Sequence, residues 1–374
     1  MSDAPGRDRT ARPPIRRVVF AEDAVGRFGG VETLLRVLAP RLRESGLRVE
    51  YLSHELPSGP APTPGPVRCF AVPGSASRWV RLAAGLRRRV FLASLGPRDA
   101  LVMMNETTAA ELLPGLSAAH RLRPRSRRPL SVMQFHSRFD STWRVRGDAI
   151  LRRAGAVCEE FLALNEQEAR RFAAAYGRPV GSIPNPVAVP VAQTPRTRRP
   201  TRVVCVARLA PEKRVDWVLR AFDAAASRHP GWELEVVGDG PERAALERLT
   251  AGLEHGQRIR FRGEVPTADL AEVYDAAGLL ALASAFEGTP MVLAEAMARG
   301  VPVVCTPSSE AVAATARAAG FLSEDSPGAF TRTLADAMGQ EETAWRELSA
   351  AALEQARTHD PQAVVEHWLR LLRR

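Results

Sequence analysis

The sequence predicts an α/β protein with two Rossmann-like, doubly wound domains. Three observations predict this class. Short apolar runs alternate with helix-length amphipathic stretches in both halves of the chain, which is the pattern of parallel sheets with helices on both faces. A Pro-rich polar segment separates the two halves. The length of 374 residues also suffices for two domains, each with a core of its own.

In the first half, we expect strands where apolar residues follow one another and helices where they recur every three or four positions. The predicted strands are residues 15–21, 47–52, 67–72, 100–104, 130–135 and 157–164. The predicted helices are residues 31–45, 78–95, 142–154 and 166–176.

The second half repeats this alternation. The predicted strands are residues 202–207, 233–237, 259–263, 279–283 and 301–305. The predicted helices are residues 215–227, 241–253, 267–276 and 290–299, with one more amphipathic helix at 361–374.

The domain boundary follows from Pro184-Asn185-Pro186 and the Pro-rich residues after it. Two doubly wound domains joined there would leave a ligand cleft between the carboxyl ends of their sheets. The first residues are polar and lack the apolar stretch of a secretory signal. The predicted parts are a disordered tail at 1–14, an N-terminal acceptor-side domain at 15–186, a linker at 187–200, a C-terminal donor-side domain at 201–357, and a helix at 358–374 that packs back toward the N-terminal domain.

The composition argues against a membrane-spanning protein and against a cysteine metal site. No apolar run approaches the ~20 residues that a membrane-spanning helix needs. The four cysteines, Cys69, Cys158, Cys205 and Cys305, are widely spaced and lie in apolar runs. We interpret all four as small buried thiols, and we expect a reduced, cytoplasmic protein that holds no metal.

Arginine dominates the charge of the chain, which contains 51 arginines and a single lysine, Lys213. Residues 1–200 carry a net charge of +16, and residues 201–374 carry −6. This asymmetry indicates two domains that face different partners. The alternative interpretation is an arginine-rich composition that scatters solvated charge.

One predicted helix, residues 78–95, is both basic and amphipathic. Trp79, Leu82, Ala83, Leu86 and Val90 recur there at helical spacing among five arginines. Such a helix can lie on an anionic membrane, so peripheral contact with the inner face of a membrane is one interpretation. The other is a helix that packs its apolar stripe on its own sheet. The arginine runs also suggest a nucleic-acid-binding protein as an alternative. The aromatic content of 6% and the lack of a recognition motif argue against this alternative.

Two loops have the features of anion sites. Gly29 and Gly30 follow the first predicted strand and precede a helix, where backbone N–H groups and the helix N-terminus attract an anion. Arg208 and Lys213 follow the first strand of the second half. A guanidinium fork beside a flexible ammonium group is suited to a diphosphate. A common turn glycine and a chance surface lysine are the alternatives.

The segment 287–304 is the most informative. Pro290 is suited to the first helical position, because its missing N–H costs nothing there. Glu287 then lies in the loop before the helix and Glu295 in its second turn. The two carboxylates could bracket a sugar nucleotide by accepting hydrogen bonds from ribose and sugar hydroxyls. Either one alone could instead be a solvated residue near a helix start. The backbone N–H groups expected to meet phosphate oxygens are those of Thr289, Met291 and Val292.

Together these residues resemble the family 4 type of GT-B glycosyltransferases. Glu287 and Glu295 form an E-x7-E arrangement, and Glu295 opens an EAMA-x-G-x-PVV run. The resemblance extends over about residues 15–370 and is most specific in the second half. The other matching segments are 208–213 at the donor diphosphate, 237–241 with the turn glycine Gly238, 263–266 with Val265 at the nucleobase, 29–32 at the donor phosphate, and Phe135 with His136 at the donor sugar.

The resemblance implies transfer of a sugar from a nucleoside diphosphate sugar, with retention of the anomeric configuration and without a metal. We expect UDP rather than GDP as the carrier. Glu287 and His136 would be the catalytic residues, with Glu287 on the sugar hydroxyls. Pro290 and the other matched residues would bind the donor. The acceptor would be a glycan, a glycolipid or a natural product, and these residues do not identify it.

The chain departs from the family pattern at three places. The loop after Glu287 reads Gly-Thr-Pro rather than the commoner Gly-Phe-Gly, which leaves the donor sugar unspecified. His136 is not followed by the usual aspartate, and Asn185 lacks its usual glycine, so Asn185 is interpreted as structural. A core or surface histidine is the alternative for His136. A sugar-nucleotide epimerase or another GT-B enzyme is the alternative for the activity.

Overall fold

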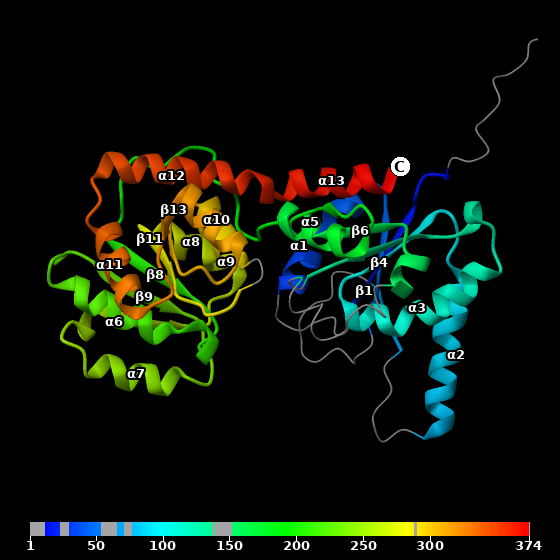
Figure 1. The fold of residues 1–374 in the computed structure, drawn as a ribbon, viewed down its shortest axis with the longest axis horizontal. Helices are drawn as coiled ribbons and strands as arrows, with labels where there is room; N and C mark the ends of the chain where they lie inside the picture. Colours follow the sequence, from blue (N-terminus) through cyan, green and yellow to red (C-terminus); the bar gives the residue numbers. More distant parts are fainter. Residues whose placement is uncertain are drawn as a thin grey trace, which may run out of the picture. The chain divides into compact units, whose positions relative to one another are not determined.

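The structure is a computed structural model that describes residues 12–22, 30–53, 66–70, 77–136, 139, 152–287 and 290–373. The chain divides into two compact units. The first consists of Met1–Pro184 and Val364–Arg374, and the second of Asn185–Ala363. Each unit contains one parallel sheet with helices packed against it (Figure 1). The predicted fold class of two Rossmann-like units is confirmed.

The first unit is built on a seven-stranded sheet with the order β3-β2-β1-β4-β5-β6-β7. The chain moves outward from β1 in one direction and then in the other, which is the doubly wound arrangement. The strands are β1 Arg17–Glu22, β2 Arg48–Ser53, β3 Val67–Cys69, β4 Asp99–Met103, β5 Leu130–Gln134, β6 Glu160–Ala163 and β7 Gly181–Ser182. The helices are α1 Gly30–Glu44, α2 Arg78–Ser94, α3 Glu106–Arg121 and α5 Glu166–Tyr176.

Strand β1 shows why its sequence is continuously apolar. Val18 and Phe20 point into a core formed with α1 and α13 (Pro361–Arg373), whereas Val19 and Ala21 point into a second core with α3. Side chains alternate between the faces of a strand, so a central strand covered on both sides needs apolar residues at every position. The C-terminal helix α13 adds Trp368 to the core of the first unit.

The second unit is built on a six-stranded sheet with the order β10-β9-β8-β11-β12-β13. Its strands are β8 Arg202–Val206, β9 Glu233–Val237, β10 Ile259–Gly263, β11 Leu279–Leu282, β12 Val303–Cys305 and β13 Gly320–Leu322. Its helices are α6 Val215–Ala226, α7 Arg243–Ala251, α8 Leu270–Asp275, α9 Met291–Ala298, α10 Glu310–Ala319, α11 Pro327–Met338 and α12 Glu342–Ala356.

Residues 187–200 differ from the predicted linker. Val187 and Val189 are buried in a core of the second unit. Arg196 donates hydrogen bonds of 2.6 to 2.7 Å to three backbone carbonyls of that unit. The Pro-rich composition therefore describes a segment without helix or strand that is nevertheless packed, and the unit boundary falls earlier, after Pro184.

The prediction of four buried cysteines is wrong at one residue, and one predicted helix lies largely outside the described residues. Cys69 is exposed, because it lies at the end of the edge strand β3, so the interpretation of four buried thiols is wrong for this residue. Burial raises the pKa of Cys158 and of Cys205 to about 12, as expected for inert thiols. The predicted helix 142–154 lies largely outside the described residues, which show helix only from 152.

Candidate active site

The predicted donor-side residues follow strands of the second sheet. Arg208 and Lys213 come after β8, Gly238 after β9, Val265 after β10 and Glu287 after β11. All these strands are parallel, so their carboxyl ends share one edge of the sheet. The sequence therefore gathers these residues at the edge where doubly wound sheets bind ligands.

Gly238, in the loop after β9, holds this loop against the neighbouring chain on both sides. Its φ is +127°, and a Cβ at this position would lie 2.0 Å from the carbonyl oxygen of Ala207. Its N–H donates to the carbonyl oxygen of Gly263 at 2.8 Å. Only glycine permits this approach of backbone to backbone. The loops after β8, β9 and β10 are thereby fixed side by side.

The loop after β8 brings Lys213 to the site through a short 3-10 turn, Pro211–Lys213. The next residue, Arg214, has left-handed backbone angles, with φ of 47° and ψ of 45°. Such angles cost a non-glycine residue about 1–3 kcal/mol and occur at functional sites. The Arg214 guanidinium lies 4.4 Å from the centre of the Trp217 ring and pairs with Asp325, and both contacts hold the turn in place.

Lys213 and Glu287 form the centre of the site. The Lys213 Nζ donates to Glu287 Oε1 at 2.6 Å, and Ser284 Oγ donates to the same oxygen at 2.7 Å. Thr306 Oγ1 in turn donates to the backbone carbonyl of Ser284 at 2.8 Å. Glu287 is 8% exposed, so a charged carboxylate is held here by a cation and a hydroxyl.

This arrangement leaves hydrogen-bonding groups of Glu287 and Lys213 available to a ligand. Both contacts to Glu287 end on Oε1, and within the described residues no hydrogen bond to Oε2 is formed. An ammonium group has three N–H donors, and one of those on Lys213 serves Glu287. The pair can therefore accept from a ligand hydroxyl at one end and donate to a ligand anion at the other.

Helix α9 brings Glu295 to the same region. Pro290 has φ of −69° and ψ of 121° and precedes the helix, so Met291 is the first helical residue and the predicted start at Pro290 is one residue early. The N–H groups of Met291 and Val292 belong to the first turn, where helical N–H groups have no intrahelical acceptor. Glu295 lies one turn later and is 5% exposed.

The carboxyl group of Glu295 is held by Tyr274 of α8. The Tyr274 hydroxyl donates to Glu295 Oε2 at 3.1 Å, and both side chains are buried. Burial raises the pKa of Glu295, and the hydrogen bond from Tyr274 acts in the opposite direction. Oε1 of Glu295 accepts no hydrogen bond from a described residue, and it is therefore free to accept a ligand hydroxyl.

Arg208 and Val265 follow β8 and β10 at the same edge of the sheet. Arg208 is exposed and pairs with Glu212, four residues later. Exposed pairs of this kind contribute little to stability, so a ligand anion can draw Arg208 away at small cost. Val265 is half-buried and packs against the core beneath the edge.

Two of the residues predicted for the site, Gly30 and His136, belong to the first unit. Gly30 is the first residue of α1. His136 follows β5 and is half-buried, and burial lowers its pKa to about 4, so the imidazole is neutral at pH 7. Its Nε2 has no hydrogen-bond partner among the described residues. Gly29 and Thr289 lie outside the described residues.

Three supporting residues were missed by the sequence interpretation. Ser284 and Thr306 position Glu287, and Tyr274 positions Glu295. A signal existed for Ser284, which lies three residues before Glu287 at the end of a predicted strand. Tyr274 had none, because its contact crosses from one helix to another and leaves no spacing in the sequence.

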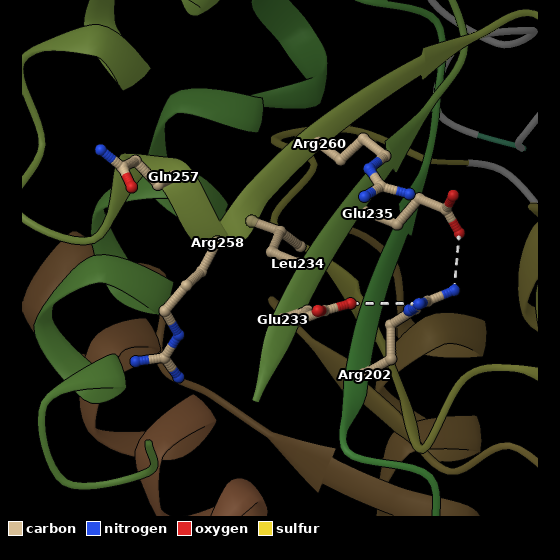
Figure 2. Close-up of a pocket in the computed structure, with 7 residues that line it drawn as sticks. All are labelled: Arg202, Glu233, Leu234, Glu235, Gln257, Arg258 and Arg260. Carbon is tan, nitrogen blue, oxygen red and sulfur yellow. Dashed lines mark hydrogen bonds and ion pairs between the residues drawn. The ribbon is translucent and has the colours of Figure 1, made fainter. Parts of the chain in front are cut away.

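A small pocket lies at the opposite edge of the same sheet (Figure 2). It lies where the strands begin, since Arg202 opens β8 and Glu233 opens β9. Arg202 pairs with Glu233 at 3.1 Å and with Glu235 at 3.6 Å. The cavity of about 30 Å³ has room for about one water molecule, and both of its carboxylates, Glu233 and Glu235, are already paired. It is therefore no candidate for a substrate site.

Neither a metal-binding cluster nor a membrane-spanning helix is found among the described residues. They contain no group of three or more His, Cys, Asp or Glu side chains that could hold a metal ion. They also contain no helix with the length and apolar content to cross a bilayer.

Comparison with known protein families places the chain in the class that the two sheets and the carboxyl-edge site define. A model of glycosyltransferase family 4 matches residues 28–189, and a model of glycosyl transferases group 1 matches residues 200–340. The two matches together span most of the chain. The chain belongs to the family 4 type of GT-B glycosyltransferases.

The alignments with curated relatives cover only part of each relative's length. An exopolysaccharide phosphotransferase from Streptomyces coelicolor is 34% identical over 163 residues, which are 42% of this chain and 17% of that protein. The amylovoran biosynthesis glycosyltransferase AmsD from Erwinia amylovora is 29% identical over 175 residues, which are 46% of this chain and 48% of that one. The chain thus aligns with less than half the length of these relatives.

Solved structures match the fold over nearly the whole chain. Anabaena HepE in complex with UDP and glucose has a TM-score of 0.72 at 18% identity and covers 96% of this chain and 99% of its own. The pneumococcal O-GlcNAc transferase GtfA in complex with UDP and GlcNAc has a TM-score of 0.72 at 12% identity, with 96% and 98% covered. At this identity the likeness establishes the fold.

Proposed function

We propose that the protein transfers a sugar from a nucleoside diphosphate sugar, with UDP preferred to GDP, to a glycan, glycolipid or natural-product acceptor. The observation that carries this proposal is the Lys213–Glu287 pair beside the N-terminus of α9, with Glu295 one turn further on. The complexes of HepE and GtfA with UDP support the choice of nucleotide.

Each group has a role in this proposal. Lys213 uses its remaining donors on the diphosphate, and Arg208 leaves Glu212 to do the same. The N–H groups of Met291 and Val292 meet phosphate oxygens, where the helix dipole favours negative charge. Glu287 Oε2 accepts from the sugar hydroxyls and stabilises the positive charge that develops at the anomeric carbon. Glu295 Oε1 accepts from the ribose.

The leaving diphosphate gains negative charge in the transition state, and Lys213 with the helix N-terminus would stabilise it. Fixed groups aimed at developing charge typically contribute more to catalysis than any other effect, and the loss of one lowers the rate by about 10²–10³-fold. We further propose retention of configuration and transfer without a metal. A chelator such as EDTA should then leave the rate unchanged, whereas loss of activity restored by Mg²⁺ would contradict this part.

Calorimetric titration with UDP, GDP and ADP tests the donor site. We expect UDP to bind, and Lys213→Gln to weaken it by about 10–100-fold, because a charge-assisted hydrogen bond is lost. Arg346→Gln is the matched control, since Arg346 also pairs with a carboxylate, Glu342, but lies on the exposed side of α12. The proposal fails if no nucleotide binds, or if both variants bind UDP as the native chain does.

The proposal assigns the acceptor to the first unit, whose half of the sequence carries the excess of arginine. His136, neutral and with an unpartnered Nε2, would contact the donor sugar. We also propose that the basic first unit contacts an anionic membrane.

A further inference from the structure

Helix α2 carries a broad exposed apolar stripe. Trp79, Leu82, Leu86 and Val90 are 79%, 54%, 63% and 62% exposed, and Ala83 beside them is exposed as well. The sequence left open a stripe packed on its own sheet, and this interpretation is wrong. Contiguous apolar side chains at the surface mark contact sites.

The opposite face of α2 does the packing. Its buried residues are Ala84, Phe91 and Leu92, which join a core of the first unit. At about 100° per residue, these side chains point roughly opposite to the stripe. In Figure 1 the N-terminal half of α2 projects beyond α3. The stripe is therefore a separate, solvent-exposed face of a helix whose opposite face already packs in the core.

The charges on α2 all have one sign. The helix contains five arginines and no acidic residue. Arg78 and Arg89 border the stripe on one side and Arg87 on the other, and all three are exposed. Arg88 points toward α3 and pairs with Glu111 at 2.8 Å. An apolar stripe between rows of guanidinium groups matches a surface that is apolar inside and negatively charged at its boundary.

We propose that α2 lies on an anionic lipid surface, with the stripe among the upper acyl chains and the bordering arginines on headgroup phosphates. Trp79 at the helix start is the residue type enriched at membrane interfaces. This inference names the segment and the binding mode behind the membrane contact proposed above. It does not depend on the donor chemistry, because α2 contains none of the residues proposed to bind the donor.

A second copy of the chain fits the stripe less well. Pairing α2 with α2 would bring two sets of arginines together. Apart from α2 residues, the large apolar side chains exposed in the described part of the chain are Leu122 and Phe286, which are too few to cover the stripe. Charge complementarity therefore favours the lipid surface.

Sedimentation with lipid vesicles tests the inference. We expect the full chain to sediment with vesicles of phosphatidylcholine and phosphatidylglycerol, less so at high salt, and not with phosphatidylcholine alone. An arginine near an anionic surface contributes about fivefold to binding, so Arg78→Gln, Arg87→Gln and Arg89→Gln together should reduce it by about a hundredfold. Leu82→Ser with Leu86→Ser should reduce it by more than about tenfold.

The control removes the same charge elsewhere. Arg220, Arg228 and Arg248 are exposed residues of the second unit, and changing all three to Gln should leave vesicle binding within about threefold. UDP titration of every variant shows whether the second unit is intact. Retained UDP binding with lost vesicle binding separates this inference from the donor proposal.

A readout in the native chain guards against variants that fail to fold. Lipids brominated in the acyl chains should quench fluorescence that is absent in Trp79→Phe. The inference is overturned if no vesicle binds, if the control variant loses as much as the α2 variants, or if quenching is the same in Trp79→Phe. It is also overturned if sedimentation velocity without lipid shows a dimer that the Leu82/Leu86 variant abolishes.

Discussion

Glu295 is a buried carboxylate whose charge is unfavourable for folding and useful for binding. Burial raises its pKa, so the folded chain holds a proton at this group more tightly than the unfolded chain does. The contribution of the Glu295 carboxyl group to the free energy of unfolding is therefore greatest at a pH below its pKa in the unfolded chain. This contribution is lost as the pH rises through its pKa in the folded chain. At pH 7 the ionised group therefore lowers the free energy of unfolding.

Glu295→Gln should separate stability from binding. The amide oxygen can still accept from Tyr274, and the buried charge is gone, so the free energy of unfolding at pH 7 should rise. This gain should shrink toward pH 4, where the native carboxyl group is protonated. UDP affinity should fall by about tenfold or more, because the ribose loses a charged acceptor. Urea unfolding at both pH values and UDP titration measure the two effects, and a variant less stable at pH 7 would contradict the argument.

Tyr274→Phe tests the positioning role of the hydroxyl. The ring still fills its site, but Glu295 loses the donor that lowers its pKa, so this pKa should rise further. UDP affinity should fall by about fivefold at pH 8, the usual effect of one hydrogen bond. The loss should grow as the pH falls, because more of the carboxyl group is then protonated. A loss that does not vary with pH would indicate a steric effect of the ring instead.

At the scale of elements, the loops at the carboxyl edge depend on a glycine that the strand pattern does not specify. Gly238→Ala would place a Cβ 2.0 Å from a backbone oxygen at φ of +127°. We expect a loss of more than about 2 kcal/mol in unfolding free energy and weaker UDP binding. Gly85→Ala in α2 is the control, since a Cβ there meets nothing within 4 Å. It should stabilise by about 0.5–1 kcal/mol, and a Gly238 variant with native stability would disprove the packing argument.

The strand pattern predicted much of the fold, because a central strand that is buried on both faces is a continuous run of apolar residues. Strands β9 and β10 and helix α5 have the predicted bounds. Helix α3, which has Pro114 in its interior, was not predicted. Helix α10, with its run of alanines, was not predicted either. The two-residue strand β7 is too short to leave a pattern.

The site was predictable where its residues share a motif and not where they meet through space. Arg208, Lys213, Glu287 and Glu295 are recognised by their spacing. The contact between Lys213 and Glu287 spans 74 residues and becomes visible only when both loops lie at one edge. For α2 the periodicity located the stripe at Trp79 and Leu86, but an apolar stripe has the same period whether it faces a sheet or the solvent.

At the scale of the whole molecule, each unit has a large buried tryptophan of its own. Trp368 on α13 belongs to the core of the first unit and contacts Phe20, with ring centres 5.8 Å apart. Trp345 on α12 is fully buried in the second unit and donates to the carbonyl oxygen of Gly278 at 2.8 Å. Since the cores are separate, we expect the two units to unfold in separate transitions.

The two tryptophans give a matched pair of variants. Trp368→Ala and Trp345→Ala should each lower the stability of one unit by about 3–5 kcal/mol. Scanning calorimetry should show Trp368→Ala lowering one transition and Trp345→Ala the other. UDP at a hundred times its Kd should raise only the transition that Trp345→Ala lowers, by about 2.7 kcal/mol, because a ligand stabilises the unit that binds it. A single transition that both variants and UDP shift together would mean that the units unfold as one body. A UDP effect on the transition of Trp368 alone would place the nucleotide in the first unit and remove the basis for the donor site at Lys213 and Glu287.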